Sequence, residues 1–137
     1  MEKKCVMVID ADLPLGLIAN TSAVLALTLG KEIDGITGQS VQDADGHSHI
    51  GITTTPIPIL KSDATMIKEL REKLFTEDFS DILVVDFSNA AQTTKNYEEY
   101  TAKLSGFTKD DLAYLGIALY GDKKKVNKLT GSMGLLR

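Results

Sequence analysis

Short apolar runs alternate along this chain with stretches in which hydrophobic residues recur at helical spacing. The apolar runs predict four strands, at residues 5–10, 56–60, 80–87 and 114–120. The runs at 5–10 and 80–87 are typical of central strands that are covered on both faces, and the second is rich in β-branched residues. Two prolines confine the run at 56–60 to a sheet edge, because proline cannot donate a ladder hydrogen bond.

The helical spacing predicts four helices. They cover residues 17–29, a segment from 63 to a point before 79, residues 96–105 and residues 123–130. Ser62 or Asp63 suits the N-cap of the second helix, and Asn96 suits that of the third. The glycines that follow three of the helices predict C-terminal caps at Gly30, Gly106 and Gly131.

The segment at 35–55 shows neither the apolar run of a strand nor the hydrophobic spacing of a helix. It is polar and contains glycine, and Asp45-Gly46 is a strong hairpin-turn dipeptide, so we expect a β-ribbon or a long loop here. The complete order of elements predicts one three-layer α/β/α domain over residues 1–137.

Composition places this domain among ordinary globular proteins. The 137 residues include 15 Lys and Arg against 19 Asp and Glu, a net charge of −4, which argues against broad charge-driven binding of nucleic acid. The single cysteine, Cys5, lies in an apolar run and predicts a buried, inert thiol. Without a disulfide, a signal peptide or an apolar membrane span, the sequence predicts a cytoplasmic protein with no membrane partner.

Motifs at both ends of the chain resemble the type II peptidyl-tRNA hydrolases. Residues 12–16 (Asp-Leu-Pro-Leu-Gly) follow the first strand, and residues 126–131 (Val-Asn-Lys-Leu-Thr-Gly) lead to a Leu-Leu tail, as in that family. The resemblance is closer still to a group of short uncharacterised bacterial proteins with the same fold. It implies a mixed four-stranded sheet with the second strand at an edge, to which this chain adds an inserted β-ribbon and an extra helix.

The resemblance also assigns a site residue and shows a difference. Asp86 stands at the end of a strand where the hydrolases have a catalytic-site aspartate, so it is the predicted catalytic residue. The lysine that the hydrolases carry at the start of the first helix is replaced by Leu17. We therefore expect a small-ligand-binding or regulatory relative, with tRNA disfavoured as a partner. The alternative is a hydrolase of a small ester or amide, or of peptidyl-tRNA, that uses Asp86.

Two loops, at 10–16 and 86–94, follow strands whose carboxyl ends meet at one edge of the sheet, where open α/β sheets bind ligands. The polar residues predicted to bind a ligand there, beside Asp86, are Asp12, Asn20, Ser88 and Asn89. Local roles are the alternative: Asp12 as a turn former, Asn20 bonding to loop backbone, and Asp86 capping amides. No cofactor and no metal are predicted.

Three further features of the sequence, a histidine pair, a basic helix and the apolar residues of the ribbon, are weaker candidates for a functional role. His47 and His49, beside acidic residues, fit either a divalent-ion site or an exposed hairpin face, which we favour because further ligands at fixed spacing are absent. The basic helix fits a solvated face better than an RNA contact; its lysines are Lys123, Lys124, Lys125 and Lys128. Apolar ribbon residues, with the edge prolines, suggest assembly into a homodimer.

Overall fold

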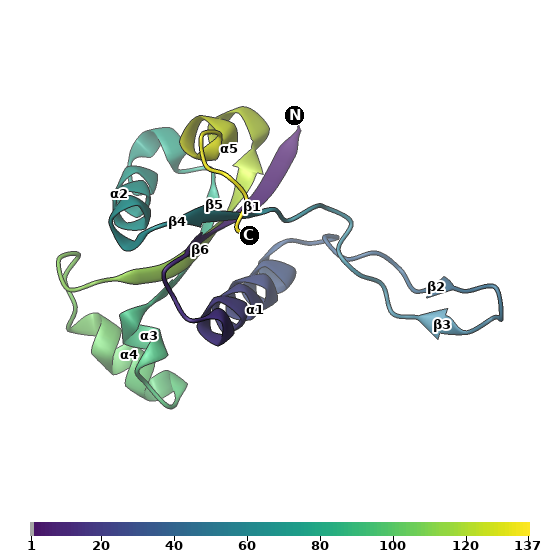
Figure 1. The fold of residues 1–137 in the computed structure, drawn as a ribbon, viewed down its shortest axis with the longest axis horizontal. Helices are drawn as coiled ribbons and strands as arrows, with labels where there is room; N and C mark the ends of the chain where they lie inside the picture. Colours follow the sequence, from purple (N-terminus) through teal and green to yellow (C-terminus); the bar gives the residue numbers. More distant parts are fainter. Residues whose placement is uncertain (1) are drawn as a thin grey trace.

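A four-stranded mixed sheet organises the computed structural model, which describes residues 2–137 (Figure 1). Its order is β4-β1-β6-β5, with β1 parallel to β4 and with β6 antiparallel to β1 and β5. The predicted mixed sheet is therefore confirmed. The strands span Lys3–Asp10 (β1), Ile59–Ser62 (β4), Leu83–Ser88 (β5) and Tyr114–Asp122 (β6).

The two edges of the sheet confirm one sequence prediction and correct another. β4 is an edge strand, as its prolines predict, although it begins at Ile59, after both of them. β5 was predicted to be central, and this prediction is wrong because β5 forms the opposite edge. Apolar, β-branched residues indicate that other elements cover the strand above and below the sheet. They do not show whether another strand is hydrogen-bonded on each side of it. The first four residues of β5 are accordingly only half-buried.

Helices cover both faces of the sheet. Successive side chains of β1 alternate between two cores: Cys5, Met7 and Ile9 face the long helix α1 (Leu15–Glu32), and Val6 and Val8 face the opposite side. Helices α2 (Ala64–Leu74) and α5 (Lys123–Thr130) pack on that opposite side. Because both faces are covered, β1 is apolar at every position from Cys5 to Ile9.

The helix ends follow the predicted caps with one exception. The carboxylate of Asp63 accepts a hydrogen bond from the Met66 amide, and Asn96 caps α4 (Tyr97–Ser105) in the same way. Gly30 was predicted to end the first helix, but α1 continues to Glu32 and is capped at Ile33. Ile33 is buried in the core on the α1 side, and the additional turn carries it there.

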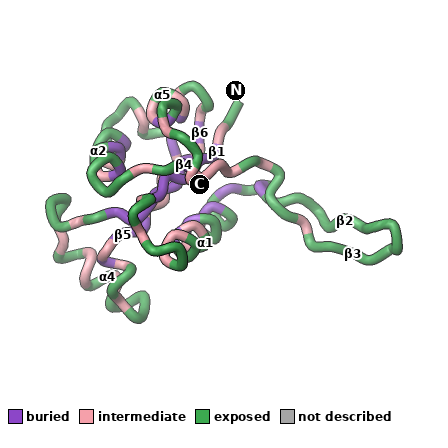
Figure 2. Tube along the Cα trace, viewed as in Figure 1, coloured by how far each residue is buried: buried purple, intermediate pink, exposed green. Residues whose placement is uncertain are grey.

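Shorter elements complete the chain. The segment predicted as a ribbon or loop is a ribbon that extends away from the sheet, formed by β2 (Val41–Gln42) and β3 (Ser48–His49) (Figures 1 and 2). A 3-10 turn, η1 (Glu77–Phe79), precedes β5, and a one-turn helix, α3 (Asn89–Gln92), follows it. In the described part of the chain, no helix has the length and apolar character needed to cross a membrane.

The cysteine prediction is supported by its environment. Cys5 is fully buried, and this burial raises the pKa of its thiol from 9.0 to about 11. At neutral pH the thiol stays protonated, so it lacks the thiolate that nucleophilic chemistry requires.

Candidate functional site

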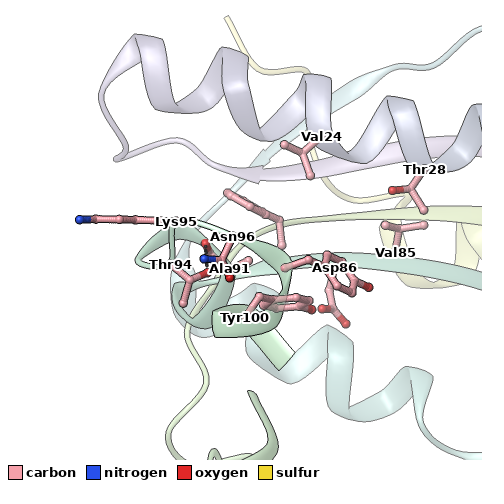
Figure 3. Close-up of a pocket in the computed structure, with 11 residues that line it drawn as sticks. Val24, Thr28, Val85, Asp86, Ala91, Thr94, Lys95, Asn96 and Tyr100 are labelled. Carbon is pink, nitrogen blue, oxygen red and sulfur yellow. Dashed lines mark hydrogen bonds between the residues drawn. The ribbon is translucent and has the colours of Figure 1, made fainter. Parts of the chain in front are cut away.

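A cleft of about 440 Å³ runs along the outer side of β5. Figure 3 shows α1 over the cleft and the segment from α3 to α4 beside it, with Asp86 near Tyr100. The walls combine apolar and aromatic side chains with a few polar groups. The lining residues are Val24, Thr28, Val85, Asp86, Phe87, Ala91, Thr94, Lys95, Asn96, Tyr97 and Tyr100.

Asp86 is held in this cleft by an arginine from α2. The Arg71 Nε donates to Asp86 Oδ2 at 2.9 Å, and the two side chains are only 13% and 26% exposed. The Arg71 guanidinium also stacks on Phe75, with Cζ 3.8 Å from the ring centroid. The carboxylate is thus fixed in position and its charge is balanced, while Oδ1 is left for another donor.

Arg71 was not among the predicted site residues. The sequence nevertheless contains a signal for it, because Ile67, Arg71 and Leu74 have the i, i+4, i+7 spacing of one helix face. Ile67 and Leu74 are buried core residues. A charged residue on a buried stripe requires a partner of opposite charge, so this pattern pointed to a carboxylate on the facing strand.

Two tyrosines supply hydroxyl groups near Asp86. Burial raises the pKa of Tyr100, and the negative charge of Asp86 adds to that shift. The pKa of Tyr114 is raised by the same two causes in the same order. Both hydroxyls stay protonated at neutral pH and can donate hydrogen bonds. Tyr97 packs against Tyr100 edge to face, with centroids 5.5 Å apart, and extends the aromatic wall.

Five site residues were predicted, all within the part of the chain that the structure describes, and of these five Asp86 lines the cleft and the other four do not. Asp12 and Asn20 are exposed, and Asp12 donates its backbone N–H to the Asp10 carboxylate at 3.0 Å. Asp10, rather than Asp12, therefore supplies the side-chain bond of the first turn. These two predicted residues lie outside the cleft.

Ser88 and Asn89 lie at the end of β5 and at the start of α3, and neither lines the cleft. Ser88 is buried, with 2% of its surface exposed. The Asn89 side chain donates to the Asp111 carbonyl at 3.1 Å and accepts from the Ala113 amide at 3.1 Å. Both ends of this amide thus hold the loop that leads into β6.

Close packing separates the first loop from the cleft. A Cβ at Gly116 on β6 would lie 2.6 Å from Ile9 Cδ1 and 2.8 Å from Thr21 Cγ2, so a larger residue would displace these side chains and glycine favours the close approach of α1 to the sheet. Thr21 is fully buried, and its hydroxyl has no partner among the described residues. The space that opens beside β5 begins one helical turn later, at Val24.

The histidine pair lies on the exposed ribbon. His49 Nε2 is 2.8 Å from the Asp43 carboxylate, and His47 Nδ1 is 3.9 Å from it. The hydrogen bond from His49, followed by that from the His47 backbone, lowers the pKa of Asp43. Within residues 2–137 no group of three His, Cys, Asp or Glu side chains is able to hold a metal ion.

The basic helix α5 is partly neutralised. Lys125 Nζ is 3.0 Å from Asp81 Oδ1, and Lys123 Nζ is 3.4 Å from the Glu2 carboxylate. These ion pairs reduce the positive field that an RNA contact would need.

Comparison with known proteins gives a family and a fold. A solved structure of a protein of unknown function, Atu0240 from Agrobacterium tumefaciens strain C58, is similar to this chain with a TM-score of 0.86, and the match covers 98% of each chain. The sequences are 21% identical, so the likeness shows the fold alone. No curated protein matches this chain. Residues 3–137 match the family described as protein of unknown function (DUF2000), and this chain therefore belongs to the DUF2000 family.

Proposed function

We propose that this chain binds a small, partly apolar molecule in the cleft beside β5 and does not hydrolyse it. The observation that carries the proposal is a cleft of about 440 Å³ that contains one fixed carboxylate, Asp86. Small-molecule sites are clefts of roughly 300–1,000 Å³ with mainly apolar walls and a few placed polar groups. The cleft has this size and this mixture of side chains.

The lining residues define the chemical class of the ligand. Val24, Val85 and Ala91 offer an apolar surface, and Tyr100 offers an aromatic face with a hydroxyl donor. Asp86 Oδ1 can accept one N–H or O–H hydrogen bond from the ligand, because Oδ2 already bonds to Arg71. The expected ligand therefore has an apolar or aromatic body and one hydrogen-bond donor.

Binding without hydrolysis is favoured by the charge balance at Asp86. A free carboxylate can act as a general base, but Asp86 is engaged by Arg71 through its own Oδ2. The position that carries a lysine in the type II peptidyl-tRNA hydrolases is Leu17 here. A ligand-binding or regulatory relative of those enzymes fits both features, and the free, buried thiol of Cys5 supports a cytoplasmic location for it.

Thermal-shift screening of a metabolite panel tests this proposal. We expect at least one compound to raise the melting temperature in a concentration-dependent way, because a ligand that binds only the folded chain stabilises it. The Asp86→Ala variant should lose the shift, whereas Asp81→Ala, which removes a carboxylate just before β5, should keep it. A shift that survives in Asp86→Ala, or a broad panel that produces none, would contradict the proposal.

One observation favours a second candidate, hydrolysis of a small ester or amide or of peptidyl-tRNA. Arg71 brings a positive charge to Asp86 from a different helix than the lysine of the resembled enzymes, and a cation of this kind can stabilise an oxyanion. Incubation with peptidyl-tRNA and a panel of small esters decides between the two. Turnover that Asp86→Asn abolishes supports hydrolysis, and equal or absent turnover in both proteins excludes it.

A further inference from the structure

The ribbon extends from the body as an arm, defined here as residues 37–56. Figure 1 shows it leaving the C-terminal end of α1 and pointing away from the sheet, and Figure 2 shows that its surface is open to solvent. Every residue from 37 to 50 is exposed. The arm therefore has no core of its own and no cover from the rest of the chain.

The sequence nevertheless specifies the shape of the arm. At the tip, the Asp43 carboxylate accepts from the amides of Asp45 (2.9 Å) and His47 (3.1 Å), and Gly46 has the positive φ of 83° that the turn requires. Further down, a side chain at Gly51 would overlap the carbonyl of Gly38, so the two strands cross at a point that only glycine permits. The arm is thus a built element.

An ordered arm of this kind needs a partner surface. An isolated two-stranded hairpin is at best marginally stable in water, and packing against another element supplies the missing stabilisation. Ile50 and Ile52 are 88% and 79% exposed, and their two-residue spacing directs both to one side of an extended strand. This apolar side is the part of the arm that a partner would bury.

The chain carries a second uncovered surface that fits this one. The exposed face of α1 consists of small residues flanked by leucines, with Leu15 81% and Leu27 80% exposed. The small residues on this face are Gly16, Ala19, Ala23, Ala26 and Gly30. At 1.5 Å per residue α1 is about 27 Å long, and one strand of the arm, at about 3.3 Å per residue, reaches about 30 Å.

The two surfaces cannot meet within one copy, because the arm leaves α1 at its end and points away from it (Figure 1). We infer that two copies of this chain form a twofold dimer, in which the Ile50–Ile52 side of each arm lies along the small-residue face of the partner's α1. A twofold arrangement closes with both arms used, so each copy donates an arm and receives one. Each copy thus contributes the apolar side of its arm together with the exposed face of α1, toward the roughly 20–30 residues per side of a standard interface.

Sedimentation equilibrium tests the dimer and the role of the arm together. We expect the wild-type chain to be a dimer, and the variant Ile50→Lys with Ile52→Lys to dissociate at least about a hundredfold more readily, because four isoleucines leave the interface. Met66→Lys, a change from apolar to charged at a residue of α2 that is 45% exposed, should leave the dissociation constant unchanged. A wild-type monomer at all concentrations, or a double variant that dimerises as well as the wild type, would overturn the proposal.

Cross-linking tests the partner surface separately. Cys5 is buried and unreactive, so single cysteines can be added to the natural sequence. An Ile52→Cys copy mixed with an Ala23→Cys copy should give a covalent heterodimer with a short bifunctional maleimide. Ile52→Cys mixed with Thr65→Cys on α2 should give none. Equal yields in the two mixtures would show that the arm does not lie on α1.

Discussion

The two edges of the sheet are protected in different ways. On the β4 side the C-terminal residues pair with the strand: Lys61 donates to the Gly134 carbonyl and Leu136 donates to the Ile59 carbonyl, each at 2.9 Å. Pro56 and Pro58 precede this strand. On the β5 side no strand of the described chain pairs with the edge, and the cleft follows it instead.

This difference separates scaffold from candidate site. An unpaired strand edge invites pairing with other chains, and proteins usually block it with backbone, prolines or charges. The β4 edge is sealed by backbone, whereas the β5 edge carries the Arg71–Asp86 ion pair and is bordered by the side chains of α3 and α4. The open edge is therefore the one where side-chain polar groups border a cleft.

Deletion of residues 133–137 should have the largest effect, because it opens the sealed edge. It removes the two backbone hydrogen bonds to β4 and the partly buried side chains of Met133 and Leu136. We expect a loss of about 4 kcal/mol in the free energy of unfolding, together with concentration-dependent aggregation. Denaturant unfolding and light scattering measure the two effects. A deletion variant as stable and as soluble as the full chain would show that the tail does not seal the edge.

Arg71→Ala should have the next largest effect, and it acts on the open edge. The substitution leaves the half-buried Asp86 carboxylate without its partner and removes the stack on Phe75, so we expect a loss of about 3 kcal/mol. The combined variant Arg71→Ala with Asp86→Ala should recover part of the loss, because the unpaired charge is gone. Chemical denaturation of the wild type, the two single variants and the double variant gives the coupling free energy. If the losses of the two single variants simply add in the double variant, a direct interaction is contradicted.

The sequence predicted the elements well because their signals are local. The alternating cores of β1, the N-caps at Asp63 and Asn96, and the turn at Gly46 depend on neighbours a few residues away. The edge position of β4 was predictable because Pro56 and Pro58 lie directly before this strand, and prolines are typical of sheet edges.

The parts that could not be predicted depend on contacts between distant residues. The apolar run of β5 gave no information on whether a strand lies beside it, and its edge position follows only from the pairing of β6 with β1. Asp86 was predicted through a family resemblance, whereas its partner Arg71 lies on helix α2, 15 positions earlier in the chain. The predicted cluster of Asp12 and Asn20 with Asp86 assumed that loops at one sheet end share one space, and the packing of Thr21 on Gly116 fills part of it.

The buried thiol of Cys5, on β1 between the two edges, should make the stability of the protein depend on pH. Its pKa is raised from 9.0 to about 11, so between these pH values the unfolded chain loses the thiol proton first and the stability falls as the pH rises. The loss is at most roughly 2–3 kcal/mol above pH 11 and is absent below pH 9. Stability measured against pH for wild type and Cys5→Ala isolates this effect. Parallel curves would contradict it.

Pro56→Ala should have the smallest effect. It distinguishes the protection of the β4 edge by the prolines from its protection by the C-terminal residues. Pro56 is exposed and precedes the strand, so its loss mainly makes the unfolded chain more flexible, at a cost of about 0.5 kcal/mol. If the C-terminal residues seal the edge, the variant stays soluble, because Gly134 and Leu136 still occupy the backbone groups of β4. The same substitution in the chain that lacks residues 133–137 should increase aggregation, since the prolines are then the only remaining block. Light scattering of the four proteins checks this, and aggregation of Pro56→Ala in the full chain would assign the protection to the proline rather than to the tail.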